Sequence, residues 1–257
     1  MNEQQSGRRT FIKHAAAGVG GFALTPLDVP HSHPTGQQKK LTVVCVGAHP
    51  GDPEFGCGGT MARYSDAGHN VIFMYLTRGE ASDASKSYKE MAALRTKEAD
   101  LSTSVLKATA KYVGQIDGET VLDKMNIASF EKLLTAEKPD LVFAHWPMDS
   151  HSDHQVAGML ALTAWVRAAR TFQLYFYEVN TGSETMAFVP TDYVHITSVR
   201  ERKKQAMFAH KTQDPINTYT KFFEPLEKFR GLESGVEAAE AFIHFKGAGL
   251  KTSITGM

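Results

Sequence analysis

The stretch LTVVCVGAHPGDPEFGCGGT, residues 41–60, combines two patterns that together predict the start of an α/β fold. Residues 41–46 are almost continuously apolar and rich in β-branched side chains, which is typical of a strand buried on both faces of a parallel sheet. After the glycine-rich polar segment, residues 60–67 predict a helix closed by Gly68, and residues 70–76 predict a second strand. This order indicates one β-α-β unit.

The rest of the chain repeats this alternation of strands and helices. A further helix is expected to begin within residues 152–155, which have the Ser-x-x-Gln form of a capping box. The pattern predicts an α/β fold with three layers, a Rossmann-like, mostly parallel sheet with helices on both faces. The other predicted strands are 111–113, 141–144, 173–179 and 193–197, and the other predicted helices are 87–107, 127–136, 199–210 and 236–242.

Residues 1–38 are predicted to lie outside this fold, as an export signal and a linker. Arg8 and Arg9 precede a weakly apolar stretch at 15–24, an arrangement that resembles a twin-arginine signal. That stretch is shorter than the roughly 20 apolar residues of a membrane span, so no stable membrane insertion is expected. The sequence therefore predicts a periplasmic or otherwise exported protein whose domain covers residues 39–257. The alternative at this point is a plain basic N-terminus.

The composition excludes some classes of partner. Lys plus Arg and Asp plus Glu both total 28, so the chain has no large basic field for a phosphate backbone, and nucleic acid is not an expected partner. A small molecule or a glycan fits better. Cys45 and Cys57 are the only two cysteines, so there is no disulfide scaffold; Cys45 is expected to be a buried thiol, and no bridge between the two is expected.

Polar clusters follow two of the predicted strands, at 48–60 and at 145–154. Ligands of open α/β sheets bind beyond the carboxyl ends of the strands, so one pocket can gather both clusters. His49, Asp52 and His154 can then converge on one metal ion. Two nitrogens and one oxygen, with a position left for water, are a ligand set of catalytic Zn²⁺, although other divalent metals also accept it.

Other residues of these clusters have both a chemical and a structural interpretation. Asp149, His151 and Asp153 surround His154, where they are suited to orient ligands or to move protons. Taken singly, a histidine at a strand end is often only hydrogen-bonded, and an aspartate at a helix start is often only a cap. The glycines at 56, 58 and 59 serve either close packing of the turn or an anion site at a helix N-terminus.

Two motifs connect the chain to a known family. The segment AHP-x-D-x-E-x-G-x-GGT after the first strand, paired with the later P-x-D-x-H-x-D-H, resembles the LmbE-like (PIG-L) family of zinc-dependent N-acetylglucosaminyl deacetylases. Weaker likenesses are YLTRGEAS at 75–82, RTKEA at 95–99 and KKQAMFAHKTQ at 203–213. The resemblance covers most of the chain from about residue 41 to residue 245.

The resemblance implies a role for each matching residue. It makes His49, Asp52 and His154 the zinc ligands, and His151 the group that polarises the amide carbonyl or protonates the departing amine. The remaining implied roles are Asp153 holding His151 in position, Glu54 orienting the turn, and Arg95 and Arg78 binding substrate.

Gly51 departs from the family pattern. The family usually has an aspartate at this position, which is taken to be the general base, and glycine offers no proton acceptor. Glu54 on the same turn and Asp149 on the facing loop are the candidate replacements. The predicted function is an exported, metal-dependent hydrolase that removes the N-acetyl group from an amino sugar or glycoside. The alternative is a metal-containing carbohydrate-binding protein whose catalysis is impaired at Gly51.

Overall fold

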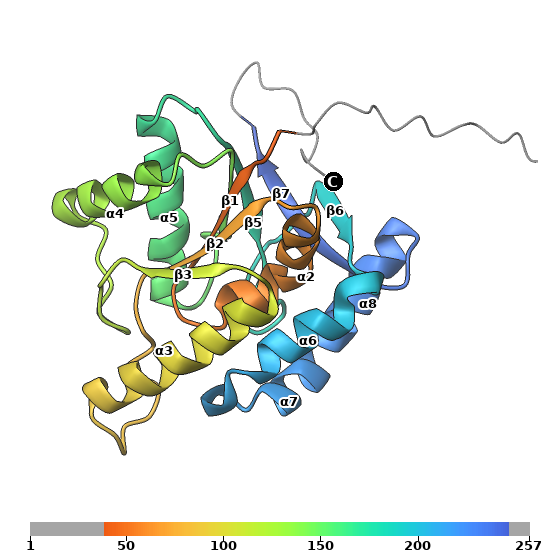
Figure 1. Ribbon diagram of the computed structural model, residues 1–257, viewed down its shortest axis with the longest axis horizontal. Helices are drawn as coiled ribbons and strands as arrows, with labels where there is room; N and C mark the ends of the chain where they lie inside the picture. The colour runs from red at the N-terminus through yellow and green to blue at the C-terminus, as the bar shows by residue number, and fades with distance from the viewer. Residues whose placement is uncertain (1–38, 247–257) are drawn as a thin grey trace, which may run out of the picture. The chain divides into compact units, whose positions relative to one another are not determined.

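Seven strands form one central sheet in the computed structural model, which describes residues 39–246 (Figure 1). Their spatial order is β3-β2-β1-β4-β5-β7-β6; the first five run parallel, β7 is antiparallel to β5, and β6 is antiparallel to β7. The predicted, mostly parallel sheet is therefore confirmed. In chain order the strands are β1 (Thr42–Gly47), β2 (Asn70–Tyr75), β3 (Thr109–Tyr112), β4 (Leu141–His145), β5 (Gln173–Tyr177), β6 (Asp192–His195) and β7 (Ala239–Phe245).

Helices cover both faces of this sheet, as the three-layer prediction requires. Helices α4 and α5 lie on one face, and α2, α3, α6 and α8 lie on the other (Figure 1). Short 3-10 segments at 197–199 and 211–213 and one π-helical turn at 219–223 join the last helices. The helices are α2 (Asp52–Asp66), α3 (Tyr88–Val105), α4 (Lys124–Ala136), α5 (Ser152–Arg167), α6 (Arg200–Phe208), α7 (Pro215–Thr218) and α8 (Glu224–Ser234).

The alternation of side chains along β1 shows how the two halves of the core are built. Val43 and Cys45 pack into the cluster on the α2 side, whereas Val44 and Val46 pack into the cluster on the α4 and α5 side. All four are fully buried. Burial on both faces explains why this strand is apolar almost without interruption.

Helix α2 begins earlier than predicted and contains a kink. The expected helix at 60–67 is its second half; the first half starts at Asp52, and Cys57 between them has non-helical angles of φ −144° and ψ 20°. A Cβ at Gly56 would overlap the Tyr177 ring, and a Cβ at Gly59 would lie 2.7 Å from Ile196 Cγ2. These glycines therefore let the kinked helix pack closely on the sheet.

The buried carboxylate of Glu240 caps the second half of α2. It accepts hydrogen bonds from the backbone N–H groups of Gly59 (2.8 Å) and Thr60 (2.7 Å) and from the Thr60 hydroxyl (2.6 Å). Lys203 Nζ lies 2.7 Å from Glu240 and 2.9 Å from Glu227, so its buried ammonium is paired on two sides. The anion at this glycine-rich helix start is thus the carboxylate of Glu240, a side chain of the protein itself.

One predicted element is wrong. Residues 236–242 do not form a helix; the helix is α8, which ends before Gly235 in a left-handed conformation (φ 75°), and the chain then enters β7. The run AAEAFIHF at 238–245 is rich in alanine and lacks clear alternation, which favours a helix locally. Pairing with β5 and β6 on its two sides overrides that local preference.

The N-terminal predictions fall outside this part of the chain. The predicted twin-arginine signal and linker at 1–38 lie outside the described residues. Within residues 39–246, none of the helices has the length and apolar composition that crossing a membrane requires.

Replacing Glu240 tests the cap of α2. We expect Glu240→Ala to lower the free energy of unfolding by about 3–5 kcal/mol, because it leaves the Lys203 ammonium and two backbone N–H groups buried with fewer partners. The exposed pair of Glu201 and Lys204 supplies the control, since Glu201→Ala should stay within about 0.5 kcal/mol. Urea denaturation of both variants measures the free energy of unfolding. Equally small decreases in the two variants would contradict a stabilising role for the Glu240 cap.

Candidate metal centre and active site

The two polar clusters meet at the carboxyl edge of the sheet, between β1 and β4. His49 and Asp52 follow the end of β1, and His154 lies in the first turn of α5, just after β4. β1 and β4 are parallel neighbours, but the chain leaves β1 toward β2 on one side and leaves β4 toward β5 on the other. The site therefore lies at the point where the strand order reverses, the usual ligand position in such sheets.

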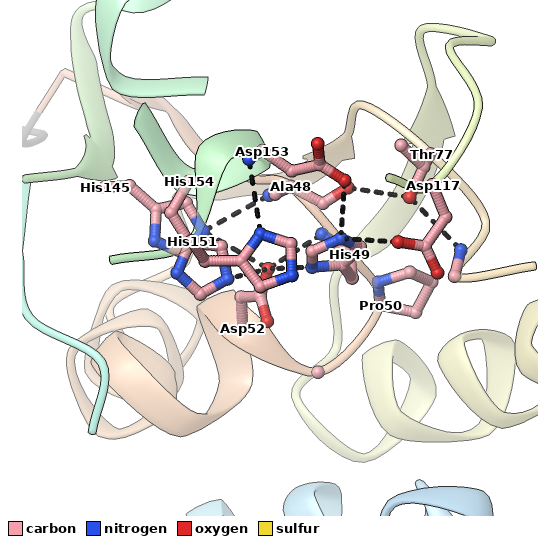
Figure 2. A network of polar contacts seen from close by, with 12 residues as sticks. Ala48, His49, Pro50, Asp52, Thr77, Asp117, His145, His151, Asp153 and His154 are labelled. Atoms are coloured by element: carbon pink, nitrogen blue, oxygen red, sulfur yellow. Dashed lines mark hydrogen bonds and ion pairs between the residues drawn. The ribbon is translucent and has the colours of Figure 1, made fainter. Parts of the chain in front are cut away.

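The carboxylate of Asp52 lies at the centre of the cluster (Figure 2). Its Oδ2 is 3.1 Å from His49 Nδ1 and 3.5 Å from His154 Nε2, and one donor atom from each of the three residues lies within 4.8 Å of the others. Two imidazole nitrogens and one carboxylate oxygen, close together and beside a cavity, are a donor set that fits Zn²⁺ or a similar divalent ion. The structure thus brings together the three residues predicted to bind metal.

His145 joins this cluster although it is not among the predicted site residues. Its Nε2 lies 3.2 Å from Asp52 Oδ2, and its ring stacks on that of His154 at a centroid distance of 4.1 Å. Burial and the neighbouring His154 lower the pKa of His145 to about 4, so its ring is neutral near pH 7. Its place as the last residue of β4 is the signal that points to it.

Both ligand imidazoles contact carboxylates through their second nitrogen. Asp149 Oδ1 lies 3.2 Å from His154 Nδ1. Asp117 Oδ1 and Asp153 Oδ2 lie 3.0 Å and 3.1 Å from His49 Nε2 (Figure 2). Such outer carboxylates fix the orientation of a metal-binding histidine. Asp117 comes from the loop after β3, and no motif in the sequence indicates it.

These contacts shift the pKa values of the central groups in opposite directions. Burial by itself would raise the pKa of Asp52, but the adjacent His49 and His154 hold it well below its usual range. Burial by itself would lower the pKa of His49, but Asp52, Asp117 and Asp153 raise it well above its usual value. Without a metal, the cluster therefore holds positive charge on His49 and negative charge on the carboxylates.

Asp153 and His151 are arranged differently from the expectation that the Asp153 side chain holds His151. The Asp153 carboxylate contacts His49 and accepts hydrogen bonds from Gly118 N (2.7 Å) and Thr120 Oγ1 (2.7 Å). It is the backbone N–H of Asp153 that donates to His151 Nδ1, at 3.2 Å. His151 is thereby the N-cap of α5, in place of the predicted Ser152–Gln155 capping box.

This cap determines the chemistry of His151. Because Nδ1 accepts a hydrogen bond, the neutral ring carries its proton on Nε2. Burial and the nearby His49 and His154 lower the pKa of His151, which favours that neutral form. The ring lies 4.6 Å from that of His154 between centroids and lines the cavity.

The two proposed replacements for the missing base do not line the cavity. Glu54 is fully buried and accepts hydrogen bonds from Tyr75 Oη (2.6 Å) and Gly51 N (3.1 Å), with His210 Nε2 at 3.0 Å. The Asp149 carboxylate contacts His154 and accepts hydrogen bonds from His151 N and Thr185 Oγ1. Glu54 therefore orients the turn at Gly51, the role expected of it, and Asp149 orients His154 and the backbone at His151.

Gly51 has a conformation that other residues rarely adopt. Its φ is 111°, and a Cβ built there would lie 3.1 Å from the Phe55 ring. An aspartate at this position would be strained in the present turn.

Arg95 and Arg78, the two predicted substrate-binding arginines, occupy different places. Arg95 lines the cavity, but its guanidinium also donates to Pro50 O (2.6 Å) and Gly79 O (3.3 Å), which joins two loops of the site. Arg78 does not line the cavity; it donates to Thr96 Oγ1 and lies over the Tyr112 ring.

The cavity above the cluster has a volume of about 390 Å³, within the usual size of small-ligand pockets. Phe55 and Phe223 form an apolar part of its wall, with ring centroids 5.0 Å apart. Asn180 and Gln213 add amide groups, and Glu184 adds a carboxylate. A ligand with both apolar faces and hydroxyl or amide groups suits this lining.

Comparisons with known proteins agree with the motifs. The family described as GlcNAc-PI de-N-acetylase (PIG-L) matches residues 44–165. Diacetylchitobiose deacetylase from Thermococcus kodakarensis is 28% identical over 237 residues, which cover 84% of this chain and 87% of the relative. The structure of N,N'-diacetylchitobiose deacetylase from Pyrococcus horikoshii is similar with a TM-score of 0.70 and 28% identity, covering 79% of this chain and 83% of the other.

The same fold also occurs with a different activity. GalB, the 4-carboxy-2-hydroxymuconate hydratase from Pseudomonas putida, has a TM-score of 0.71 at 18% identity, covering 83% of this chain and all of the other. At that identity the likeness concerns the fold alone. Activity must therefore be argued from the site.

Replacing Asp149 tests the outer contacts of His49 and His154, the two candidate metal ligands. We expect Asp149→Asn to weaken zinc binding about 10–100-fold, because the charge that orients His154 is lost. Asp100→Asn, an exposed position on α3, is the matched control and should leave the affinity unchanged. Competition with a chromophoric chelator gives both dissociation constants; equal affinities would show that Asp149 does not support the site.

Proposed function

Because this chain belongs to the LmbE-like (PIG-L) family, we propose that it is an exported, metal-dependent hydrolase that removes the N-acetyl group from an N-acetylated amino sugar or glycoside. The observation that carries the proposal is the cluster of His49, Asp52 and His154 beside a cavity that His151 also lines. The names of the two diacetylchitobiose deacetylases support the substrate class.

The residues of the cluster would hold a zinc ion between β1 and β4. When bound, the ion polarises a carbonyl and lowers the pKa of water toward about 7. His49, Asp52 and His154 supply the donor atoms, and the outer carboxylates keep both imidazoles in orientation.

His151 acts on the amide itself. Its Nε2–H is suited to donate to the carbonyl oxygen of the acetamide, which stabilises negative charge as it develops there. The same proton is then available to the nitrogen of the departing amine. The Asp153 N–H that caps Nδ1 keeps the ring in the tautomer that this role needs.

The cavity wall is suited to an amino sugar. Phe55 and Phe223 offer apolar surface to the faces of a sugar ring, while Asn180 and Gln213 offer partners for its hydroxyl groups. Export, inferred from the arginine pair at positions 8 and 9, places the enzyme among extracytoplasmic glycan fragments and glycosides.

Because Gly51 offers no proton acceptor, we expect hydrolysis by this enzyme to be slow. Losing a positioned base typically costs about 10²–10⁴-fold, while the metal and electrostatic contributions stay intact. Among the described residues, Asp117 and Glu184 are the carboxylates besides Asp52 that line the cavity. They replace Glu54 and Asp149 as the acids to test for proton transfer.

Acetate release tests the proposed function directly. The full-length chain, zinc-loaded or chelated, should be incubated with a panel of N-acetylhexosamine glycosides. We expect acetate from at least one sugar with zinc and none after chelation, since the donors cannot polarise the amide alone. Absence of acetate while zinc stays bound would overturn the proposal in favour of a carbohydrate-binding protein.

His151 has its own test. We expect His151→Ala to lower kcat about 10²–10⁴-fold with little change in zinc affinity, because the ring acts on the substrate rather than on the metal. The exposed His195 provides the control, and His195→Ala should keep wild-type kcat. A His151→Ala enzyme with unchanged kcat would exclude the assigned role.

A further inference from the structure

The two cysteines of the chain lie against each other in the interior, behind the metal-binding turn. Cys45 is on β1 and Cys57 is at the kink of α2, and both are free, fully buried thiols. Their Sγ atoms are 2.8 Å apart. We propose that Cys45 and Cys57 form a disulfide bond when the chain is held in an oxidising compartment, which reverses the expectation from the sequence.

The geometry carries this inference. Non-bonded carbon atoms usually stay about 3.5–4.0 Å apart, and sulfur is larger than carbon, whereas the sulfurs of a disulfide are about 2.05 Å apart. The 2.8 Å between these Sγ atoms lies between the two values, so a small movement joins them. The kink at Cys57, with φ −144°, departs from the helical path at the residue that faces the strand.

The position of the pair links it to the site. The segment between the cysteines leaves β1, carries His49 and Asp52, and enters α2. A bond at its base would close a short loop around two of the three residues that bind metal. Such a bond restricts the unfolded chain and thereby stabilises the folded one.

The bond forms by thiol–disulfide exchange with a small disulfide such as oxidised glutathione. One cysteine thiolate attacks it, forms a mixed disulfide and releases one glutathione thiolate. The other cysteine thiolate attacks the protein sulfur of that mixed disulfide, forms the Cys45–Cys57 bond and releases the second glutathione. The protein loses two electrons and two protons, and the glutathione disulfide gains them.

Burial determines when this exchange occurs. Neither sulfur is accessible in the folded chain, and burial raises the pKa of both thiols, so the attacking thiolate is scarce there. The bond therefore forms during folding or during transient opening of the contact between β1 and α2. An exported chain meets the oxidising conditions in which such bonds persist.

The test uses the purified, reduced full-length chain. It is incubated with oxidised glutathione at rising guanidinium concentrations up to full unfolding, then diluted to refold, and remaining thiols are trapped with maleimide in denaturant. We expect both thiols to disappear together, with a mass about 2 Da lower, and a Tm roughly 5–10 °C above that of the reduced protein. Adding a reductant should return both the mass and the Tm to those of the reduced protein.

Single-cysteine variants provide the controls. Cys45→Ala and Cys57→Ala should show no dependence of Tm on reductant, and each should gain only a glutathione adduct. Two thiols that persist in the wild-type chain, or glutathione adducts without a bridge, would overturn the inference. The intact mass of the wild-type chain decides this even if a variant does not fold, and it requires neither substrate nor metal.

Discussion

The partly buried carboxylate of Asp52, surrounded by imidazoles, holds the two halves of the site together. Asp52 Oδ2 lies within 3.5 Å of nitrogens from His49, His145 and His154. His49 follows β1, His145 ends β4, and His154 lies in the first turn of α5, the helix after β4. An isolated carboxylate at this depth would cost several kcal/mol, so Asp52 depends on these partners or on a cation in their midst. The parallel pairing of β1 and β4 meets that requirement, because parallel neighbours end at the same edge of the sheet.

Two further carboxylates fix the helix that carries Asp52. Glu240 caps the second half of α2 from β7, and Glu54 accepts the N–H of Gly51 at its start while contacting Tyr75 and His210. The turn that carries His49 and Asp52 is therefore anchored to β2, to β7 and to the segment after α6. Glu54, which the sequence offers as a candidate base, thus supports the turn, because its oxygens already contact Gly51 N, Tyr75 Oη and His210 Nε2.

The extent to which the sequence predicts this structure depends on whether the signal is local. The apolar run at 41–46 predicts β1 correctly, and the placement of His49, Asp52 and His154 follows from two strand ends and one motif pair. By contrast, β7 depends on partners far away in the sequence, and its alanine-rich run gives no local sign of them. Asp117 is undetectable for the same reason: its contact with His49 exists only once the loop after β3 has been placed.

The left-handed backbone at Gly51 also bears on how this chain can change over generations. With φ at 111° and the Phe55 ring 3.1 Å from a Cβ built at position 51, an aspartate introduced there would be strained in the present turn. The neighbouring side chains and the backbone would have to shift together for an acid to be tolerated there. A carboxylate at another position of the cavity wall, such as Asp117 or Glu184, therefore fits the present backbone more readily than one at position 51.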